Sequence, residues 1–490
     1  MSPRRVFMFL SFLHFCSLLL TDLCVHASNR AALGFQPLPW DFYAHETVNV
    51  KGLPDWLRGT LYRIGPAIWT QRPDDQHWFY GLGFLQSFQF SPDENHLEYT
   101  AQFVKSSEYN QSHPNFSDES SATFSPNTGV CIRRVKSDDA THLLANTGAS
   151  LSNEFDYRSL DSVETPFMYD DMMATVLAKA PSHAQTDLDG NIVHFLQVPE
   201  PAVYYYIYTI PYGSRTRKFV GKVALNPTFN TTLFLHSFVI TENYVVIPEI
   251  PAVSGPEDYR TFRFESSMNT TWRVISRKTA EQVAEFTSEP FFYYHTINAY
   301  ENDTDDTIIV DLIGYPNMTS LVDMYLENII DKPELLRNSA CANRMMRFVL
   351  PMRKTSSAII PRILSEVWGT ELPTIRDTTH ATRAYTYVYA VAYTDPHASD
   401  FLDSIVKVDV LNGKYKRWHE PGCYPGEPIF VASPNSASED DGIVLSLVLD
   451  VNAKTSFLLT LNAKSMEVMA KAYLPHATPF GFHGRYYRDL

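Results

Sequence analysis

The sequence predicts a large all-β protein, and three observations support this fold class. Runs of β-branched and aromatic residues recur along the chain, separated by Gly, Pro, Asn or Asp. Only two segments, Asp161–Ala180 and Leu321–Asp331, show a helical pattern, and it is weak. The composition, 44% hydrophobic and 13% aromatic, supplies apolar surface for a large core. Many short strands of this kind are typical of a sandwich, a barrel or a propeller.

Five segments show the strand pattern most clearly, and all are rich in β-branched, leucine or tyrosine residues. They are Val203–Ile210, Tyr244–Pro248, Thr307–Ile313, Tyr385–Tyr393 and Gly442–Leu449. Two polar stretches, Ser106–Ser125 and Ser433–Asp441, are predicted to be exposed loops. No repeat of the WD or kelch type is visible, so pattern alone does not choose among the three architectures.

The N-terminal 27 residues resemble a secretory signal peptide. Arg4 and Arg5 give a positive start, an apolar run follows over Val6–Leu20, and Val25 and Ala27 are small enough for a signal peptidase. The run is shorter than the roughly 20 residues of a membrane-spanning helix, so we expect cleavage, with an uncleaved anchor as the alternative. We therefore expect residues 28–490 to fold as a single domain.

Glycosylation triplets agree with export to a secreted or secretory-lumen location. Six N-x-[ST] sequences without proline are present, and they would make the protein a glycoprotein. Their asparagines are Asn110, Asn115, Asn230, Asn269, Asn302 and Asn317.

Cysteine content and charge narrow the range of partners. Beyond the leader, Cys131, Cys341 and Cys423 allow at most one internal disulfide, whose pairing the sequence does not determine. The formal charge of −15 argues against nucleic acid as a partner and against simple adhesion to anionic lipid. This negative charge does not argue against an apolar ligand.

Four of the 16 histidines stand in unusual settings. His236 and His295 lie in apolar or aromatic segments, His483 lies in an apolar stretch near the C-terminus, and His183 precedes a turn signal that ends at Gly190. A metal ion on one ring nitrogen and a carboxylate on the other would satisfy such rings. For any one of them alone, an ordinary core or surface histidine is the commoner interpretation.

Two glutamates are candidates for those carboxylates. Glu371 and Glu427 are each surrounded by proline and apolar residues, which suits a buried partner better than a solvated surface. The alternative is a loop glutamate that pairs with a nearby arginine.

Around these residues the chain resembles the carotenoid cleavage oxygenase family, in particular its animal β-carotene oxygenases and retinoid isomerohydrolase. The similarity runs from Gly59–Pro66 to the terminal Phe-His-Gly484, and its strongest internal blocks are His295–Glu301, Tyr424–Val431 and Glu439–Leu445. The resemblance implies a seven-bladed β-propeller with helical and loop insertions that cap its top face.

The resemblance also implies a metal centre. Iron(II) would lie on the propeller axis, bound by His183, His236, His295 and His483, with dioxygen as co-substrate. Glu371 and Glu427 stand where the family has carboxylates that orient the histidine rings.

The implied reaction is the oxidative cleavage of a conjugated double bond of a carotenoid or apocarotenoid, which gives aldehyde or ketone products. The expected ligand is thus an apolar polyene in an apolar tunnel, for which Tyr204, Tyr206, Tyr208 and Phe291 are candidate wall residues, with ordinary strand packing as the alternative. Such a substrate must come from a membrane or a lipid carrier, so peripheral membrane contact is open. The oligomeric state is not predicted.

The chain departs from the family pattern at several places. A third glutamate is expected within Ala145–Asp156, where ungapped counting finds Leu151 and a small shift would supply Glu154. Tyr80 replaces an aspartate of the family, and Gln86 replaces a histidine. Loss of such partners typically costs about 10–100-fold in metal affinity or activity. Two alternatives therefore stay open: a secreted carotenoid- or retinoid-binding protein with impaired catalysis, and a retinyl ester isomerohydrolase.

Overall fold

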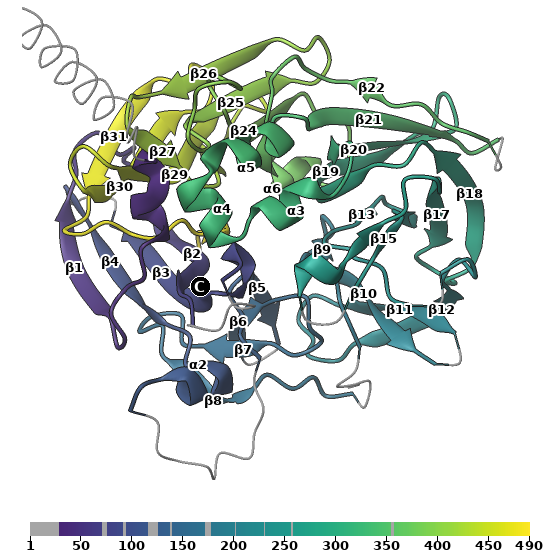
Figure 1. The fold of residues 1–490 in the computed structure, drawn as a ribbon, viewed down its shortest axis with the longest axis horizontal. Helices are drawn as coiled ribbons and strands as arrows, with labels where there is room; N and C mark the ends of the chain where they lie inside the picture. The colour runs from purple at the N-terminus through teal and green to yellow at the C-terminus, as the bar shows by residue number, and fades with distance from the viewer. Residues whose placement is uncertain are drawn as a thin grey trace, which may run out of the picture.

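Seven antiparallel sheets account for most of the structure, a computed structural model that describes residues 29–70, 76–91, 95–115, 126–137, 140–171, 178–200, 202–229, 231–255, 258–353 and 357–490. The sheets follow one another around a ring (Figure 1). This arrangement confirms the seven-bladed β-propeller. The expected leader, residues 1–27, lies outside the described residues.

Each blade is built from strands that follow one another in the chain, except that the first blade also contains the last strand. Blades one to three contain β1 (Tyr43–Asn49), β2 (Gly59–Ile68), β3 (Leu82–Phe90), β4 (His96–Phe103) and β32 (His483–Tyr487); β5 (Cys131–Lys136), β6 (Thr141–Asn146), β7 (Asn153–Phe155) and β8 (Ser162–Pro166); and β9 (Gln185–Thr186), β10 (Ile192–Pro199), β11 (Val203–Ile210) and β12 (Lys218–Ala224).

Blades four to seven complete the ring, and blade four carries the small added pair β15 (Ala252–Val253) and β16 (Arg263–Phe264). Their strands are β13 (Val239–Ile240), β14 (Tyr244–Glu249), β17 (Thr270–Ser276) and β18 (Gln282–Ser288); β19 (Phe292–Asn302), β20 (Thr307–Tyr315), β21 (Arg344–Pro351) and β22 (Arg362–Ile363); β23 (Glu371–Thr374), β24 (Tyr387–Ala392), β25 (Ser404–Asp409) and β26 (Tyr415–His419); and β27 (Cys423–Pro425), β28 (Ile429–Ala432), β29 (Gly442–Asp450), β30 (Thr455–Asn462) and β31 (Val468–Tyr473).

Pairing between the two ends of the chain closes the ring. Strand β32 runs antiparallel to β2, with His483 opposite Ile64. Closure leaves no open edge between the first and last blades, where an unpaired strand would expose its backbone donors and acceptors. It also carries the C-terminal histidine to the centre of the molecule.

The helices are short. They are η1 (Arg30–Phe35), η3 (Trp78–Tyr80), α2 (Ser107–Ser112), η4 (Tyr259–Thr261), α3 (Thr319–Asp323), α4 (Leu326–Asp331), α5 (Pro333–Ala340) and α6 (Asp377–His380). Helices α3, α4, α5 and α6 group toward the centre of the ring, whereas α2 lies at its edge beside β8 (Figure 1). Within the described part of the chain, no helix has the length and apolarity that crossing a membrane requires.

The hydrophobic core lies between adjacent blades. Leu61 and Phe88 of blade one, for example, share a buried cluster with Leu445 and Leu458 of blade seven. Each sheet is packed between two neighbouring sheets, so its strands bury side chains on both faces. This explains why many strands are nearly continuous apolar runs in the sequence. The chain's three described cysteines, Cys131, Cys341 and Cys423, are free thiols.

The five segments with the clearest strand pattern form β11, β14, β20, β24 and β29, so those predictions are confirmed to within a few residues. Residues 433–441 form the predicted connection between β28 and β29. The polar stretch Ser106–Ser125 instead begins with α2, where the Ser106 hydroxyl accepts a hydrogen bond from the Tyr109 N–H at 3.1 Å. Its residues 116–125 lie outside the described structure.

The helix expected over Asp161–Ala180 is wrong for the residues that the structure describes. Ser162–Pro166 forms β8, the last strand of blade two, because the ladder with β7 offers this segment more partners than an isolated weak helix. The helix expected over Leu321–Asp331 is interrupted between α3 and α4, where Tyr325 forms a β-bridge with His77.

Candidate metal centre and cavity

Four histidines meet at the propeller axis, and each comes from a different blade. His183 lies just before β9, His236 lies just before β13, His295 lies within β19, and His483 begins β32. All four strands lie at the end of their sheet that faces the axis. Residues separated by one to three blades in sequence therefore converge in space.

His236 lies in an irregular segment that precedes β13. The next residue stabilises this segment, because the Ser237 hydroxyl donates to the Tyr294 carbonyl at 2.7 Å and accepts from the Thr296 N–H at 3.1 Å. The Tyr293 hydroxyl also donates to the Ser237 carbonyl at 2.8 Å. These bonds to β19 replace a strand ladder and fix the backbone beside the histidine.

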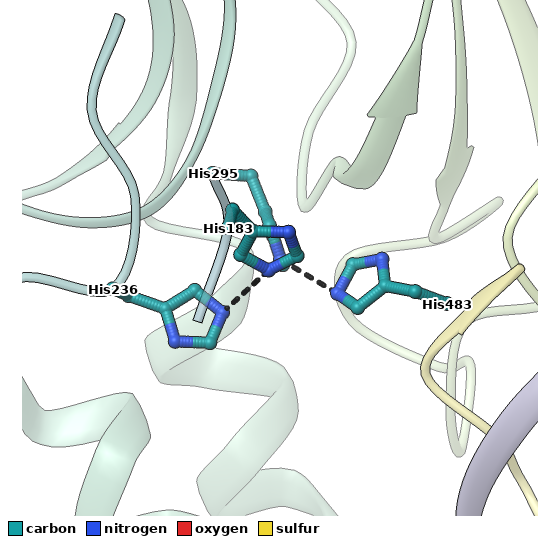
Figure 2. Close-up of side chains that lie close together, drawn as sticks. All are labelled: His183, His236, His295 and His483. Carbon is teal, nitrogen blue, oxygen red and sulfur yellow. Dashed lines mark hydrogen bonds between the residues drawn. The ribbon is translucent and has the colours of Figure 1, made fainter. Parts of the chain in front are cut away.

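The ring nitrogens have the spacing of ligands to one metal ion (Figure 2). The Nε2 atoms of His183 and His236 are 3.2 Å apart, as are those of His295 and His483, and all four ligand atoms lie within 4.8 Å of one another. With metal–nitrogen bonds of about 2.1 Å, ligands at right angles are ~3.0 Å apart and opposed ligands ~4.2 Å apart. The 3.2 Å pairs therefore match adjacent ligands of a single ion, and the 4.8 Å limit is slightly wider than the spacing of opposed ligands.

Burial keeps three of these imidazoles in the form that binds metal. It lowers the pKa of His183, His236 and His483, and the neighbouring imidazoles lower the pKa of His183 and His236 further. For His483, Glu427 partly offsets the effect of burial on the pKa. A neutral ring keeps a lone pair free for coordination, which a protonated ring lacks.

Glu371, the first residue of β23, orients the His295 ring. His295 Nδ1 lies 2.5 Å from Glu371 Oε2, and the carboxylate also accepts from the Tyr315 hydroxyl at 2.6 Å and the Leu372 N–H at 2.9 Å. Burial raises the pKa of Glu371, but His295 and these hydrogen bonds hold it below the usual value. Leu372 has a positive φ of 52°, so the backbone is strained where it presents this carboxylate.

Glu427 orients His483 in the same way and also neutralises a buried arginine. Its Oε1 lies 2.7 Å from His483 Nδ1, and its Oε2 accepts from the Gly484 N–H at 2.7 Å and from Arg63 at 3.2 Å. Arg63 is only 2% exposed and also donates to the Phe482 carbonyl at 3.3 Å. Both predicted outer carboxylates thus lie beside the ring nitrogens that point away from the centre.

The sequence did not identify Arg63 as a site residue. It lies in the Gly59–Pro66 block that carries part of the family resemblance, but an arginine inside an apolar strand gives no sign of its partner 364 residues away. Only ring closure brings the two together.

His183 and His236 have no carboxylate partner among the described residues. Glu154, the candidate third glutamate, faces His142 instead, with 2.6 Å between Oε1 and Nδ1. The pair lies within blade two, because residue 154 is paired with Leu144 on β6. The small shift that would bring Glu154 to the metal centre is therefore wrong, and Leu151 provides no charge in its place.

The histidines open onto an apolar cavity of about 350 Å³. His236, His295 and His483 form part of its wall. At one end its lining is buried and apolar, and includes Leu336, Ala340, Tyr393, Phe401 and Leu402. At another end the lining includes the exposed residues Gly148 and Lys179, so the cavity runs from the surface past the histidines to a closed apolar end.

A second, more polar cavity of about 180 Å³ meets the same cluster. His183, His295 and His483 line it together with Asn298, Asp377 and Arg485. The cluster therefore separates an apolar compartment from a polar one.

Comparisons with known proteins agree with this geometry. Residues 39–488 match the family described as retinal pigment epithelial membrane protein. The chain belongs to this family of carotenoid cleavage oxygenases. It is 28% identical to carotenoid cleavage dioxygenase 8 of Arabidopsis thaliana, over 89% of this chain and 82% of that protein. It is 27% identical to the carotenoid isomerooxygenase of Galleria mellonella, over 88% of this chain and 91% of that protein.

A solved structure shares the fold of this carotenoid cleavage oxygenase. The cobalt-substituted apocarotenoid oxygenase of Synechocystis superposes with a TM-score of 0.78 and 21% identity, covering 94% of this chain and 98% of that one. At this identity the likeness supports the propeller architecture.

Of the departures from the family pattern, one reaches the cavity. Tyr80 lines it and stacks on Tyr259, with ring centroids 4.9 Å apart and an interplanar angle of 8°. Gln86 lies instead within β3, buried, and donates to the Tyr99 hydroxyl at 3.1 Å. Only the tyrosine is placed to contact a ligand.

The four residues expected to form the tunnel wall do not line this cavity. Tyr204, Tyr206 and Tyr208 lie on β11, which is two strands from β9 and hence away from the axis. Phe291 packs between Trp272 and Phe348, at centroid distances of 5.8 and 5.2 Å. Ordinary strand packing therefore describes all four.

The aromatic wall comes from other segments. It includes Phe79, Phe234, Tyr259, Tyr294 and Phe482. Phe234, Tyr294 and Phe482 lie within two residues of a histidine of the cluster. Proximity in sequence to those histidines could therefore have identified them as cavity residues.

Proposed function

We propose that this chain is an iron(II) dioxygenase that cleaves a conjugated double bond of a carotenoid or apocarotenoid. The observation that carries the proposal is the cluster of four imidazoles, three of which line a deep apolar cavity. Four nitrogen donors suit several transition metals, so the choice of iron is supported by family membership and the dioxygenase name of the Arabidopsis relative.

The chain's own residues would position the reactants. Glu371 and Glu427 hold the Nδ1 side of two rings, which directs the Nε2 lone pairs toward the centre. The apolar cavity would hold the polyene, exclude water and place one bond beside the cluster. Bound iron would supply the activation of dioxygen. The overall reaction consumes one C=C bond and one O₂ molecule and forms two C=O groups.

Metal analysis tests the centre. The parent protein should bind about one iron per chain, and His483→Ala should lose most of it, whereas His96→Ala on β4 should retain the parent content. Unchanged iron in the His483 variant would overturn the proposed centre. The reaction has a separate test: iron-loaded protein that leaves a panel of carotenoids, apocarotenoids and stilbenes unchanged under oxygen is no such dioxygenase.

A second candidate is a carotenoid-binding protein with impaired turnover. It is favoured by the absence of a carboxylate partner for His236 within the described structure, since Glu154 is used elsewhere. Pigment that co-purifies at one molecule per chain, without product under oxygen, would select it. Product formed without oxygen would instead select isomerohydrolase chemistry.

We also propose that the protein enters the secretory pathway. The apolar run after Arg5 and the six glycosylation triplets support this location, and Asn269 and Asn317 are exposed. A mobility shift on treatment with an N-glycosidase, reduced in Asn269→Gln and Asn317→Gln, is the expected result. Absence of glycan together with co-fractionation with mitochondria would contradict it.

A further inference from the structure

Lys179 is the one lysine or arginine among the described residues that line the largely apolar cavity. It lines the cavity beside Ala180, and its backbone pairs with Gln197 of β10, with N···O distances of 3.2 and 2.7 Å. Its side chain is exposed, while the neighbouring Ala178 and Ala180 are buried. The β-bridge to Gln197 thus fixes the backbone of Lys179, while its ammonium group is accessible to solvent or to a ligand.

No partner neutralises this ammonium group within the described residues. No hydrogen bond, ion pair or aromatic contact of its Nζ is found there, in contrast to Lys222, which pairs with Glu200 at 2.9 Å. The one acidic residue described in the cavity wall, Glu371, is committed to His295 and Tyr315. Desolvation lowers the pKa of Lys179, as expected for a group that protein partly surrounds on a cavity wall.

The lysine and the closed end of the cavity lie on opposite sides of the metal centre. Lys179 is bound to blade three, whereas Tyr393, Phe401 and Leu402 belong to blade six. These blades face each other across the ring (Figure 1). The histidines, which come from the inner ends of four blades, cluster between them. A linear ligand that reaches from one end to the other must therefore pass the cluster.

We propose that Lys179 binds the oxygenated end group of a linear apocarotenoid, a carboxylate or an aldehyde, and so selects such substrates over hydrocarbon carotenes. The proposal rests on the oxygenase function proposed above. An acceptor oxygen gives the ammonium group the partner that the protein does not provide. A hydrocarbon end placed there would desolvate the cation without compensation. Because the lysine is fixed to blade three, the same contact sets which double bond reaches the histidines.

Equilibrium binding tests the proposal apart from turnover. Iron-loaded, full-length protein is titrated under nitrogen with an apocarotenoic acid, the matching aldehyde and a hydrocarbon polyene of equal length. Quenching of tryptophan fluorescence reports binding, since Trp78 lines the cavity. Lys179→Met keeps the chain length without charge, Lys179→Arg keeps the charge, and Lys222→Met removes a lysine outside the cavity as the matched control.

In Lys179→Met, affinity for the acid should fall about tenfold or more and affinity for the aldehyde about threefold, because a charged hydrogen bond is worth more than a neutral one. Affinity for the hydrocarbon should stay within about twofold, as should all three affinities in Lys222→Met. Lys179→Arg should recover most of the acid affinity.

Equal affinities of the parent and Lys179→Met for the acid would overturn the proposal, and so would a parent protein that binds none of the three ligands. Iron content serves as the folding control for each variant. Because no cleavage occurs under nitrogen, this result is independent of the turnover test. If the protein binds iron and cleaves carotenoids, but Lys179→Met does not change its relative affinities for the three ligands, this inference alone is refuted.

Discussion

Replacement of Glu427 by glutamine should destabilise the metal-free protein more than the same change at Glu371. Three donors converge on the Glu427 carboxylate: His483 Nδ1, the Gly484 N–H and Arg63. An amide offers one acceptor oxygen and must turn an NH₂ group toward at least one of these donors. It also leaves the buried Arg63 without a counter-charge, and burial already lowers the pKa of that guanidinium.

The expected magnitude follows from the arginine. Removing one partner of a buried ion pair typically costs about 3–5 kcal/mol. Glu371 accepts from His295, Tyr315 and Leu372, and no buried arginine depends on it, so Glu371→Gln should cost only about 1–2 kcal/mol. For a protein of this size, ~1 kcal/mol shifts Tm by about 1 °C. Both variants should lose about 10–100-fold in metal affinity, because each leaves one ligand ring without its carboxylate.

Thermal melts of the metal-free variants at a fixed scan rate, with chelator competition for the affinities, provide the measurements. The double variant Arg63→Met/Glu427→Gln removes the unpaired cation and should recover part of the lost Tm without restoring metal affinity. Equal Tm losses for Glu427→Gln and Glu371→Gln, or no recovery in the double variant, would refute the reasoning that Arg63 dominates the difference.

Three further outcomes are expected. Burial lowers the pKa of His77 to about 3, so this ring stays neutral in the folded protein at a pH where the unfolded chain binds a proton there. His77 alone should therefore contribute a loss of about 2 kcal/mol in the free energy of unfolding from pH 8 to pH 5, and His77→Gln should reduce that slope in denaturant titrations. Ala340→Leu narrows the closed end of the cavity and should weaken binding of the longest polyenes about tenfold in quenching assays, with unchanged iron content; equal affinities would place the ligand elsewhere. Iron at a hundredfold excess over Kd should add about 2.7 kcal/mol, seen as a Tm rise that His483→Ala abolishes.

The predictions that succeeded rested on local patterns or ordered blocks. Segments such as Val203–Ile210 became strands because β-branched and aromatic residues suit a sheet packed on both faces. The histidines and Glu371 were candidates chiefly through the ordered blocks that the chain shares with the oxygenase family, and their apolar surroundings gave a weaker local signal. Where a pattern was weak, as in Asp161–Ala180, the β ladder overrode the helical preference.

The predictions that failed depended on distances between blades. Tyr204, Tyr206 and Tyr208 are aromatic and near His183 in sequence, yet their strand stands away from the axis. Glu154 is near the expected position in the chain, yet its place on β7 turns it toward His142. In both cases the position of a strand within its blade decides what a side chain can reach, and that position does not show in the local sequence.

The sequence by itself determined the all-β class, the four candidate ligands and the two carboxylates beside them. The tertiary structure alone decided that the four nitrogens lie within 4.8 Å, that Arg63 pairs with Glu427, and that the cavity extends from Lys179 to Phe401 past the cluster. The physical reason is closure of the ring: local preference fixes each strand, but only the pairing of β32 with β2 closes the ring of inner strands around one axis.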